Sequence, residues 1–485
     1  MSSGSEEGIP SDRHASVGGG SASNTRDAGQ CPRREVAEQI SLLDESYTAA
    51  PEADRTVSTK LAELVARARK ETRLTNVVQY VDEELLRLAF QSLRKQAAPG
   101  VDGLSYEEYA AGLDENLWDL YRRLKSGRYR APVIRRVYIP KANGKRRALG
   151  LTTIEDRVVQ KAVAWVLSAV FDQDFLDCSH GFRPNRSPHT ALHRLREGMM
   201  QHWARYVVEV DVVNYFGAVS WAWLRKFVRH RVNDGGLIRL LNKWLKAGVM
   251  ENGVVSLTTE GVPQGGPVSP VLSNIYLHYV LDLWFERRFK KTCRGYAELT
   301  RFADDFVATF RHRADAVRFR QEMEERLAAF GLQIAPEKTA LLRFDGTLLF
   351  GEGRPAIKPA TFTFLGFTHY LRKSRSGPVN IERKPSVKAR ERFIRKVGTW
   401  LKANKHLNVW EQQEHLAKAL NGYIQYFGLR LCCTSLYGVR QRVRQLWRKA
   451  LMRRSQRAHR HCDWTSLNTK AWFQLPTPRV THAWV

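Results

Sequence analysis

LTRFADDFVATF, residues 299–310, places two adjacent carboxylates, Asp304 and Asp305, between two apolar, strand-like stretches. The segment predicts a β-hairpin with both carboxylates at its tip. Aspartate is common in turns, so an ordinary polar turn is the alternative interpretation. Other carboxylates near the same hairpin would favour a functional site instead.

A third carboxylate, Asp211, lies near the end of a second apolar strand, YVVEVDVV at 206–213. Burying a lone carboxylate costs several kcal/mol unless it is paired or binds a metal. Carboxylates from two neighbouring strands offer the hard oxygen ligands that Mg²⁺ prefers, and substrate phosphates complete its coordination. Two such ions, about 3.5 to 4 Å apart, stabilise both the attacking and the leaving oxygen of a phosphoryl transfer. The pattern therefore favours a magnesium site.

Strands and helices alternate around these segments, which predicts an α+β fold. The sequence at 133–151 predicts two short strands around a turn at Asn143 and Gly144. Ser105, with Glu108 three residues later, predicts the start of a helix. Apolar periodicity predicts further helices at 221–247, 268–289 and 314–330, and an apolar helix face at Leu416, Leu420, Tyr423 and Phe427.

Nine motifs, in this order along the chain, together resemble the bacterial group II intron-encoded reverse transcriptase and maturase. They are APGVDGLS, YIPKANGKRRALGL, IEDRVVQKAV, SHGFRPNRSPHTAL, VEVDVVNYF, GVPQGGPVSPVLSNIYL, RFADDF, GLQIAPEKT and FTFLGF. The resemblance covers roughly residues 75–485 and is to the form without an endonuclease domain. It implies a right-hand polymerase with fingers, a palm and an α-helical thumb or maturase domain.

The resemblance makes Asp211, Asp304 and Asp305 the catalytic, metal-binding residues of the palm. They would hold two Mg²⁺ ions, with Mn²⁺ as an alternative. One ion would lower the pKa of the primer 3′-hydroxyl, and the other would hold the incoming triphosphate.

Five further residues match positions near the nucleotide in this family. Phe216 would lie against the sugar and exclude a 2′-hydroxyl, although a core aromatic is the alternative. Gln264 would contact the nucleotide and template, and Lys338 would lie near the nucleotide and primer. Lys141 and Arg147 would grip the triphosphate, the task of cationic donors, although a solvated run of charges is the alternative.

The sequence departs from the family pattern next to the catalytic residues. The family usually has a lysine and further acids after the first catalytic strand, where this chain has Val213, Asn214, Gly217 and Ser220. Phe302 replaces the usual tyrosine before the paired aspartates and keeps the ring that would pack under the primer end. We expect activity to persist.

Charge is the dominant feature of the composition. The 485 residues carry 78 Lys and Arg against 49 Asp and Glu, a net charge of +29, and residues 371–485 alone hold 25 basic and 5 acidic residues. Such a balance favours nucleic acid as a partner, with an anionic membrane surface as the weaker alternative. The expected RNA or DNA contacts are Arg183, Lys384, Lys388, Arg395, Arg444, Arg448, Arg453 and Arg454. For Arg183 a structural contact is the alternative.

We predict five regions from the composition shifts and the resemblance. They are a disordered tail at 1–56, fingers with an N-terminal extension at 57–200, a palm at 201–370, a helical thumb or maturase domain at 371–450 and a basic segment at 451–485.

Two kinds of site are not expected. The Cys and His residues near 432 and 459–462 lack a paired Cys-x-x-Cys spacing, which argues against zinc. No apolar stretch reaches the length of a membrane span, so the bacterial cytoplasm is the expected location.

These observations predict an RNA-directed DNA polymerase of a group II intron. It would act on template–primer and dNTPs and bind intron RNA to assist splicing and retromobility. Two alternatives remain open: an RNA-binding splicing factor with a vestigial palm, and a domesticated reverse transcriptase in phage defence.

Overall fold

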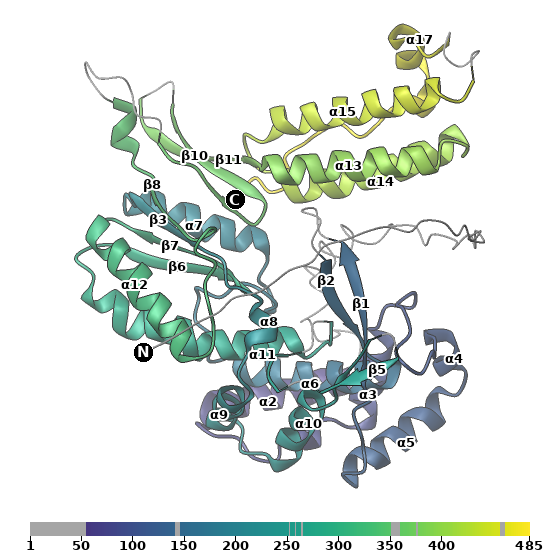
Figure 1. Cartoon of the computed structure of the whole chain (residues 1–485), viewed down its shortest axis with the longest axis vertical. Helices are drawn as coiled ribbons and strands as arrows, with labels where there is room; N and C mark the ends of the chain where they lie inside the picture. Colours follow the sequence, from purple (N-terminus) through teal and green to yellow (C-terminus); the bar gives the residue numbers. More distant parts are fainter. Residues whose placement is uncertain are drawn as a thin grey trace, which may run out of the picture.

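The computed structural model describes residues 55–140, 146–251, 253–257, 259–262, 265–350, 359–374, 377–455 and 461–485. The predicted N-terminal tail lies outside these ranges except for its last two residues. Figure 1 shows an elongated molecule with a largely helical lower part, a central sheet and an upper part of long helices. The mixture of helices and mainly antiparallel sheets confirms the predicted α+β class.

The central sheet contains both carboxylate-bearing segments. Its order is β6-β7-β3-β8 and all its pairings are antiparallel. The predicted hairpin at 299–310 is confirmed as β6 and β7, and the predicted strand at 206–213 as the shorter β3. The bounds are Ala297–Phe302 for β6, Asp305–Phe310 for β7, Tyr206–Val210 for β3 and Ala340–Arg343 for β8.

Neighbouring residues along a strand of this sheet pack into different hydrophobic cores. Val208 and Phe306 belong to the lower core, together with apolar residues of α12 (Arg313–Ala329). Val207 and Val307 belong to the upper core, together with residues of α7 (Pro188–Gln201). Because side chains alternate between the faces of a strand, one sheet covers both cores.

The lower part is built around α6 (Ile154–Phe171), which is buried along nearly its whole length. The predicted hairpin at 133–151 is confirmed as an antiparallel pair in the sheet β2-β1-β4-β5, although its turn at 141–145 lies outside the described residues. The strands are β1 (Ile134–Pro140), β2 (Arg146–Leu151), β4 (Val249–Glu251) and β5 (Val254–Ser256). The other helices are α2 (Arg55–Lys70), α3 (Glu83–Gln91), α4 (Tyr106–Ala111), α5 (Leu113–Lys125), α8 (Tyr215–Ala218), α9 (Trp221–Arg231), α10 (Gly235–Leu245) and α11 (Ser269–Leu277).

Local capping decides where two of these helices begin. Ser105 and Glu108 form the predicted capping box at the start of α4. The helical region expected at 221–247 is present as two separate helices, α9 and α10. Asp234 accepts a hydrogen bond from the Leu237 amide at 3.1 Å and so caps α10.

The upper part packs three long helices beside a small sheet, as Figure 1 shows. The predicted apolar face at 416–427 is confirmed as buried. Trp447 is fully buried, donates to Gln412 Oε1 at 2.9 Å and stacks on Phe473, so residues beyond 460 share this core. The elements are β9 (Phe362–Phe364), β10 (Phe367–Lys373), β11 (Val379–Pro385), α13 (Val387–Ala403), α14 (Val409–Phe427), α15 (Cys433–Met452) and α17 (Trp464–Thr469).

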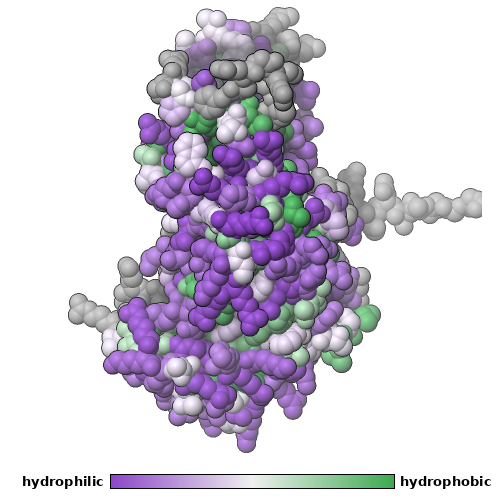
Figure 2. Space-filling model, turned by 90° about the vertical axis from the view of Figure 1, so that its left-hand side faces the viewer, coloured by the Kyte–Doolittle hydropathy of each residue, from purple (hydrophilic) through white to green (hydrophobic). Residues whose placement is uncertain are grey.

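One face of the molecule is mainly polar, in agreement with the high charge content of the sequence. Figure 2 shows a face that is mainly hydrophilic, with hydrophobic residues in small scattered groups. None of the described helices is long and apolar enough to cross a membrane.

A fully buried ion pair joins the central sheet to the lower helices. Arg301, in β6, donates to both carboxylate oxygens of Asp282, at 2.8 and 2.5 Å. Asp282 ends a π-helical turn, His278–Asp282, that continues α11. Both side chains are wholly inaccessible to solvent, so each charge depends on the other for compensation.

We expect Asp282→Asn to lower the free energy of unfolding by about 3–5 kcal/mol, because it leaves the Arg301 charge buried and uncompensated. Glu286→Gln is the matched control, since Glu286 lies one turn further on and pairs with Lys290 at the surface. The control should change stability by less than about 1 kcal/mol. Urea unfolding of the two variants measures the difference, and equal midpoints would contradict the assigned role of the pair.

Candidate active site

The three predicted catalytic aspartates come from one end of the central sheet. Ala303 and Asp304 form the two-residue turn between β6 and β7, and Ala303 has φ +56°. Val210 pairs with Phe306, so Asp211 and Asp305 are the next residues across the same antiparallel pair. Directly opposed residues have Cβ atoms about 4.5–5.5 Å apart. Backbone pairing therefore brings Asp211 beside the paired aspartates.

The turn that carries Asp304 is held from two sides. Arg301 donates to the Ala303 carbonyl at 3.0 Å and to Asn274 Oδ1 at 3.0 Å. Asn274 in turn donates to the Gly181 carbonyl at 2.6 Å. A Cβ atom at Gly181 would come within 2.4 Å of the Ala303 amide nitrogen, so the close contact requires glycine.

These supporting residues were missed in the sequence analysis. Gly181 lies in the motif SHGFRPNRSPHTAL and Asn274 in GVPQGGPVSPVLSNIYL, but nothing in their spacing shows that they meet at the catalytic turn. The segment before Gly181 also pairs with β6: the Arg301 amide donates to the Cys178 carbonyl, and the His180 amide donates to the Arg301 carbonyl, both at 2.8 Å.

The site carries excess negative charge. The dense protein surroundings, together with the negative charges of Asp304 and Asp211, raise the pKa of Asp305 to about 7. The Asp305 side chain nevertheless remains exposed to solvent, so an ion from solution can reach it. An environment that disfavours a carboxylate's charge is one in which a bound cation is stabilised.

Lys338 neutralises part of this charge. Its ammonium group forms an ion pair with Asp211, and both side chains are substantially exposed. An exposed pair is stabilised by about 0–1 kcal/mol, so a divalent cation can displace it. The prediction that Lys338 lies near the nucleotide and primer stays a prediction, and in this structure its contact is with Asp211.

The donor set suits a hard divalent cation in its chemistry. Carboxylates from two strands meet at one accessible edge, as Mg²⁺ coordination requires. No group of three His, Cys, Asp or Glu side chains in the described ranges already surrounds a metal position. The aspartates would therefore adjust their rotamers, and Asp211 would leave Lys338, when an ion binds.

Phe216 lies beside the segment that leads to Gln264. Its carbonyl accepts a hydrogen bond from the Val262 amide at 2.7 Å. Its ring is half-buried and lies edge-on to Tyr215 at 5.4 Å. Gln264 itself lies outside the described residues. Phe216 thus lies next to Val262, the last described residue before Gln264 in the sequence.

The basic hairpin approaches the same loop. A Cβ atom at Gly265, which has φ +114°, would lie 2.4 Å from the carbonyl oxygen of Gly150 in β2. This contact places the loop after Gln264 against the strand that carries Arg147. Lys141 and the Arg147 side chain lie outside the described parts of the chain.

Of the two roles expected for Arg183, a nucleic-acid contact or a structural contact, its position favours the structural one. Arg183 is buried and donates to Asp172 Oδ1 at 2.6 Å and to the carbonyls of Leu176 and Ser179 at 2.8 and 2.9 Å. Its guanidinium group is occupied by protein acceptors, so the residue stabilises the fold here.

The other predicted nucleic-acid contacts belong to the upper part. Arg444 and Arg448 are half-buried beside the Trp464 ring, at 5.4 and 5.3 Å from its centroid. The remaining five are exposed: Lys384, Lys388, Arg395, Arg453 and Arg454.

Residues 139–369, which include the whole carboxylate site, match the family model described as reverse transcriptase (RNA-dependent DNA polymerase). Over these residues the chain is similar to reverse transcriptases. The predicted resemblance is thereby confirmed for this part of the chain.

Relatives of the reverse transcriptase domain include intron-encoded proteins. The chain is 40% identical over 194 residues to Protein YkfC of Escherichia coli (strain K12), covering 39% of this chain and 51% of that protein. It is 36% identical over 201 residues to the Group II intron-encoded protein LtrA of Lactococcus lactis subsp. cremoris, and the match covers 40% of this chain and 33% of that protein. It is 31% identical over 214 residues to the Putative COX1/OXI3 intron 1 protein of Saccharomyces cerevisiae (strain ATCC 204508 / S288c), and the match covers 44% of this chain and 25% of that protein. The matched region thus spans about half or less of each relative.

We expect the stability of the metal-free protein to depend on pH through Asp305. Its folded pKa of about 7 lies above the unfolded value of about 3.9. The folded state therefore binds this proton more tightly, and the resulting stabilisation is complete below about pH 4 and lost as the pH rises through about 7. The melting temperature of wild type relative to Asp305→Asn should fall over this range.

Thermal unfolding with a chelator present, from pH 5 to 8, measures this difference. Added Mg²⁺ should raise the melting temperature of wild type at pH 8 more than that of Asp305→Asn. Parallel pH curves for the two proteins would contradict the assignment of the pKa to Asp305.

Proposed function

We propose that this chain is an RNA-directed DNA polymerase. The observation that supports it is the meeting of Asp211, Asp304 and Asp305 at one edge of the sheet within a reverse transcriptase domain. Such a site would extend a DNA primer by in-line attack of its 3′-hydroxyl on the α-phosphate of a dNTP, with release of pyrophosphate.

The three aspartates would hold two Mg²⁺ ions, or Mn²⁺ as an alternative. When bound, these ions would activate the primer hydroxyl and offset the charge of the triphosphate. Asp211 would exchange Lys338 for the metal, which leaves the ammonium group free to face an anionic substrate. The buried Arg301 would keep the turn at Asp304 rigid, because it donates to the Ala303 carbonyl.

The remaining residues would orient the substrate. The Phe216 ring, fixed through its own backbone carbonyl, would lie under the deoxyribose and exclude a 2′-hydroxyl. Gln264 would contact the nucleotide and template, and Lys141 and Arg147 would approach the triphosphate from the β1–β2 hairpin. The contact of Gly265 with Gly150 supports this arrangement, since it brings the hairpin and the loop together.

We further infer that the polymerase belongs to a group II intron and acts as a maturase. The similarity to LtrA, a group II intron-encoded protein, supports this assignment. Residues 371–485 hold 25 basic residues against 5 acidic ones, and this positive charge suits a large RNA partner. We assign fingers to 57–200, a palm to 201–370, a thumb or maturase domain to 371–450 and a basic segment to 451–485.

The test is primer extension by the purified protein on poly(rA)·oligo(dT) with dTTP and Mg²⁺. Wild type should extend the primer, and Asp304→Ala combined with Asp305→Ala should reduce extension by about three orders of magnitude or more, because the metal-binding carboxylates are lost. Chelation of Mg²⁺ should have the same effect on wild type. An inactive wild type that still binds structured RNA tightly would favour a splicing factor with a vestigial palm.

We expect Phe216→Ala to relax the selection of deoxynucleotides. Removal of the ring should raise the relative efficiency of rNTP over dNTP incorporation by about tenfold or more, because the 2′-hydroxyl no longer meets a steric barrier. The ratio of kcat/KM for dTTP and UTP on the same template measures the effect. An unchanged ratio in an active variant would support the alternative that Phe216 is only a core aromatic.

A further inference from the structure

Helices α9 and α10 form a basic region outside the carboxylate site. Together they carry six Lys and Arg residues and no Asp or Glu. One of these cations, Arg231, is buried and paired with Asp174 at 2.8 Å, so it serves the fold. Lys243 donates to the Gly127 carbonyl at 2.8 Å, and the other four cations are half-buried or exposed.

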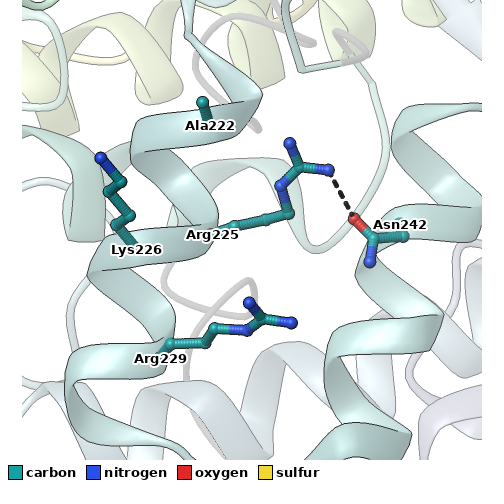
Figure 3. Close-up of a pocket in the computed structure, with 5 residues that line it drawn as sticks. All are labelled: Ala222, Arg225, Lys226, Arg229 and Asn242. Carbon is teal, nitrogen blue, oxygen red and sulfur yellow. Dashed lines mark hydrogen bonds between the residues drawn. The ribbon is translucent and has the colours of Figure 1, made fainter.

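Three cations of α9 border a hollow between the two helices. The hollow has a volume of about 320 Å³ and is lined by Ala222, Arg225, Lys226, Arg229 and Asn242. Figure 3 shows Arg225 and Arg229 reaching from α9 toward α10, where Asn242 accepts a hydrogen bond from Arg225 at 3.4 Å. Ala222 leaves room at one end because its side chain is a single methyl group.

A second hollow continues the first along the surface. It has a volume of about 520 Å³, and its lining includes Lys226 and Arg229 again, together with Thr72, Arg73 and His230. The two shared residues join the hollows into one track. Arg73 comes from the loop after α2, so the track spans three segments of the chain.

The lining of the track selects the chemistry of its ligand. Among the described residues that line the two hollows there is no carboxylate, so the positive charges are not offset within them. Guanidinium groups, an ammonium group, an amide and a hydroxyl are donors suited to phosphate oxygens. No Phe, Tyr or Trp lines either hollow, and base stacking would need such a ring.

We propose that this track binds the phosphodiester backbone of a nucleic-acid duplex, independently of base sequence. Two adjoining hollows that share two cations suit successive phosphates of one strand better than a single small anion. In Figure 1, α9 and α10 lie at the opposite end of the molecule from α13, α14 and α15. A nucleic acid that occupies the track is therefore held at a point remote from the basic upper helices.

The inference deepens the proposed function, since it names a second contact surface for nucleic acid. Its test uses direct binding rather than catalysis. The probes are a blunt-ended RNA duplex and a DNA duplex of the same sequence, which offer no recessed 3′ end or single-stranded template to the carboxylate site. Dissociation constants are measured over a series of salt concentrations.

The test variant combines Arg225→Gln, Lys226→Gln and Arg229→Gln. Its affinity should fall about 10- to 100-fold at physiological salt, and the slope of log Kd against log salt should decrease by about two to three. Ala222→Glu is a second, single-residue variant that places a negative charge in the hollow and should weaken binding in the same direction. Melting temperatures establish that both variants are folded.

The matched control removes three exposed cations elsewhere, with Lys291→Gln, Arg311→Gln and Arg313→Gln. It has the same net charge as the test variant and should retain the wild-type slope. If the test variant loses affinity for the RNA duplex alone, the track binds the RNA backbone. If it loses affinity for both duplexes, the track binds the backbone of either nucleic acid. Equal affinities and slopes for the test variant and the control would overturn the proposal.

Primer extension on poly(rA)·oligo(dT) separates this inference from the proposed function. At saturating template–primer the test variant should keep the kcat of wild type, because none of its residues belongs to the carboxylate site, whereas its KM for template–primer should rise. An inactive wild type whose duplex binding still depends on the track would refute the polymerase proposal and leave the track supported.

Discussion

The guanidinium group of Arg301 is the point on which the candidate active site depends. It is fully buried in β6, and a charge there is tolerated only because Asp282 compensates it and Ser179, Asn274 and the Ala303 carbonyl accept its remaining hydrogen bonds. The Arg301 side chain thereby connects the turn that carries Asp304 to the helix that continues α11 and to the segment before Gly181. A buried network of this kind is rigid only when it is complete, so the position of Asp304 depends on residues that contact no substrate.

The central sheet imposes a second constraint, because both of its faces are buried. Val208 faces one hydrophobic core and Val207 the other, and a shift of one residue in register would exchange them. The pairing that opposes Val210 to Phe306 is therefore fixed by packing along the whole strand. Asp211 and Asp305 follow this pair at the strand end. Packing in the two cores thus determines which carboxylates meet.

Sequence reasoning succeeded where the pattern is local. The alternation around Asp304 and Asp305, the capping box at Ser105 and the hairpin before Leu151 each depend on a few neighbouring residues, and each agrees with the structure. It failed where contacts between residues far apart in the sequence determine the structure. The cap at Asp234, which separates two helices within the helical region expected at 221–247, was missed. Arg183, for which nucleic-acid and structural contacts were both open, finds its acceptors inside the protein. Partners such as Gly181 and Ala303, more than a hundred residues apart, leave no local pattern.

The distribution of charge suggests how a polyanion and an acidic site coexist in one molecule. The upper helices and the track on α9 carry the positive charge that attracts phosphate, and this attraction acts over about 10 Å at ordinary salt. The aspartates repel the same phosphates at close range, and the raised pKa of Asp305 reflects that their charges are poorly compensated. Lys338 offsets one of the three, through a pair that solvent weakens. In the proposed polymerase, a reacting phosphate would therefore approach the carboxylates closely only when divalent cations supply the missing positive charge, so metal binding would be a condition for substrate binding as well as for chemistry.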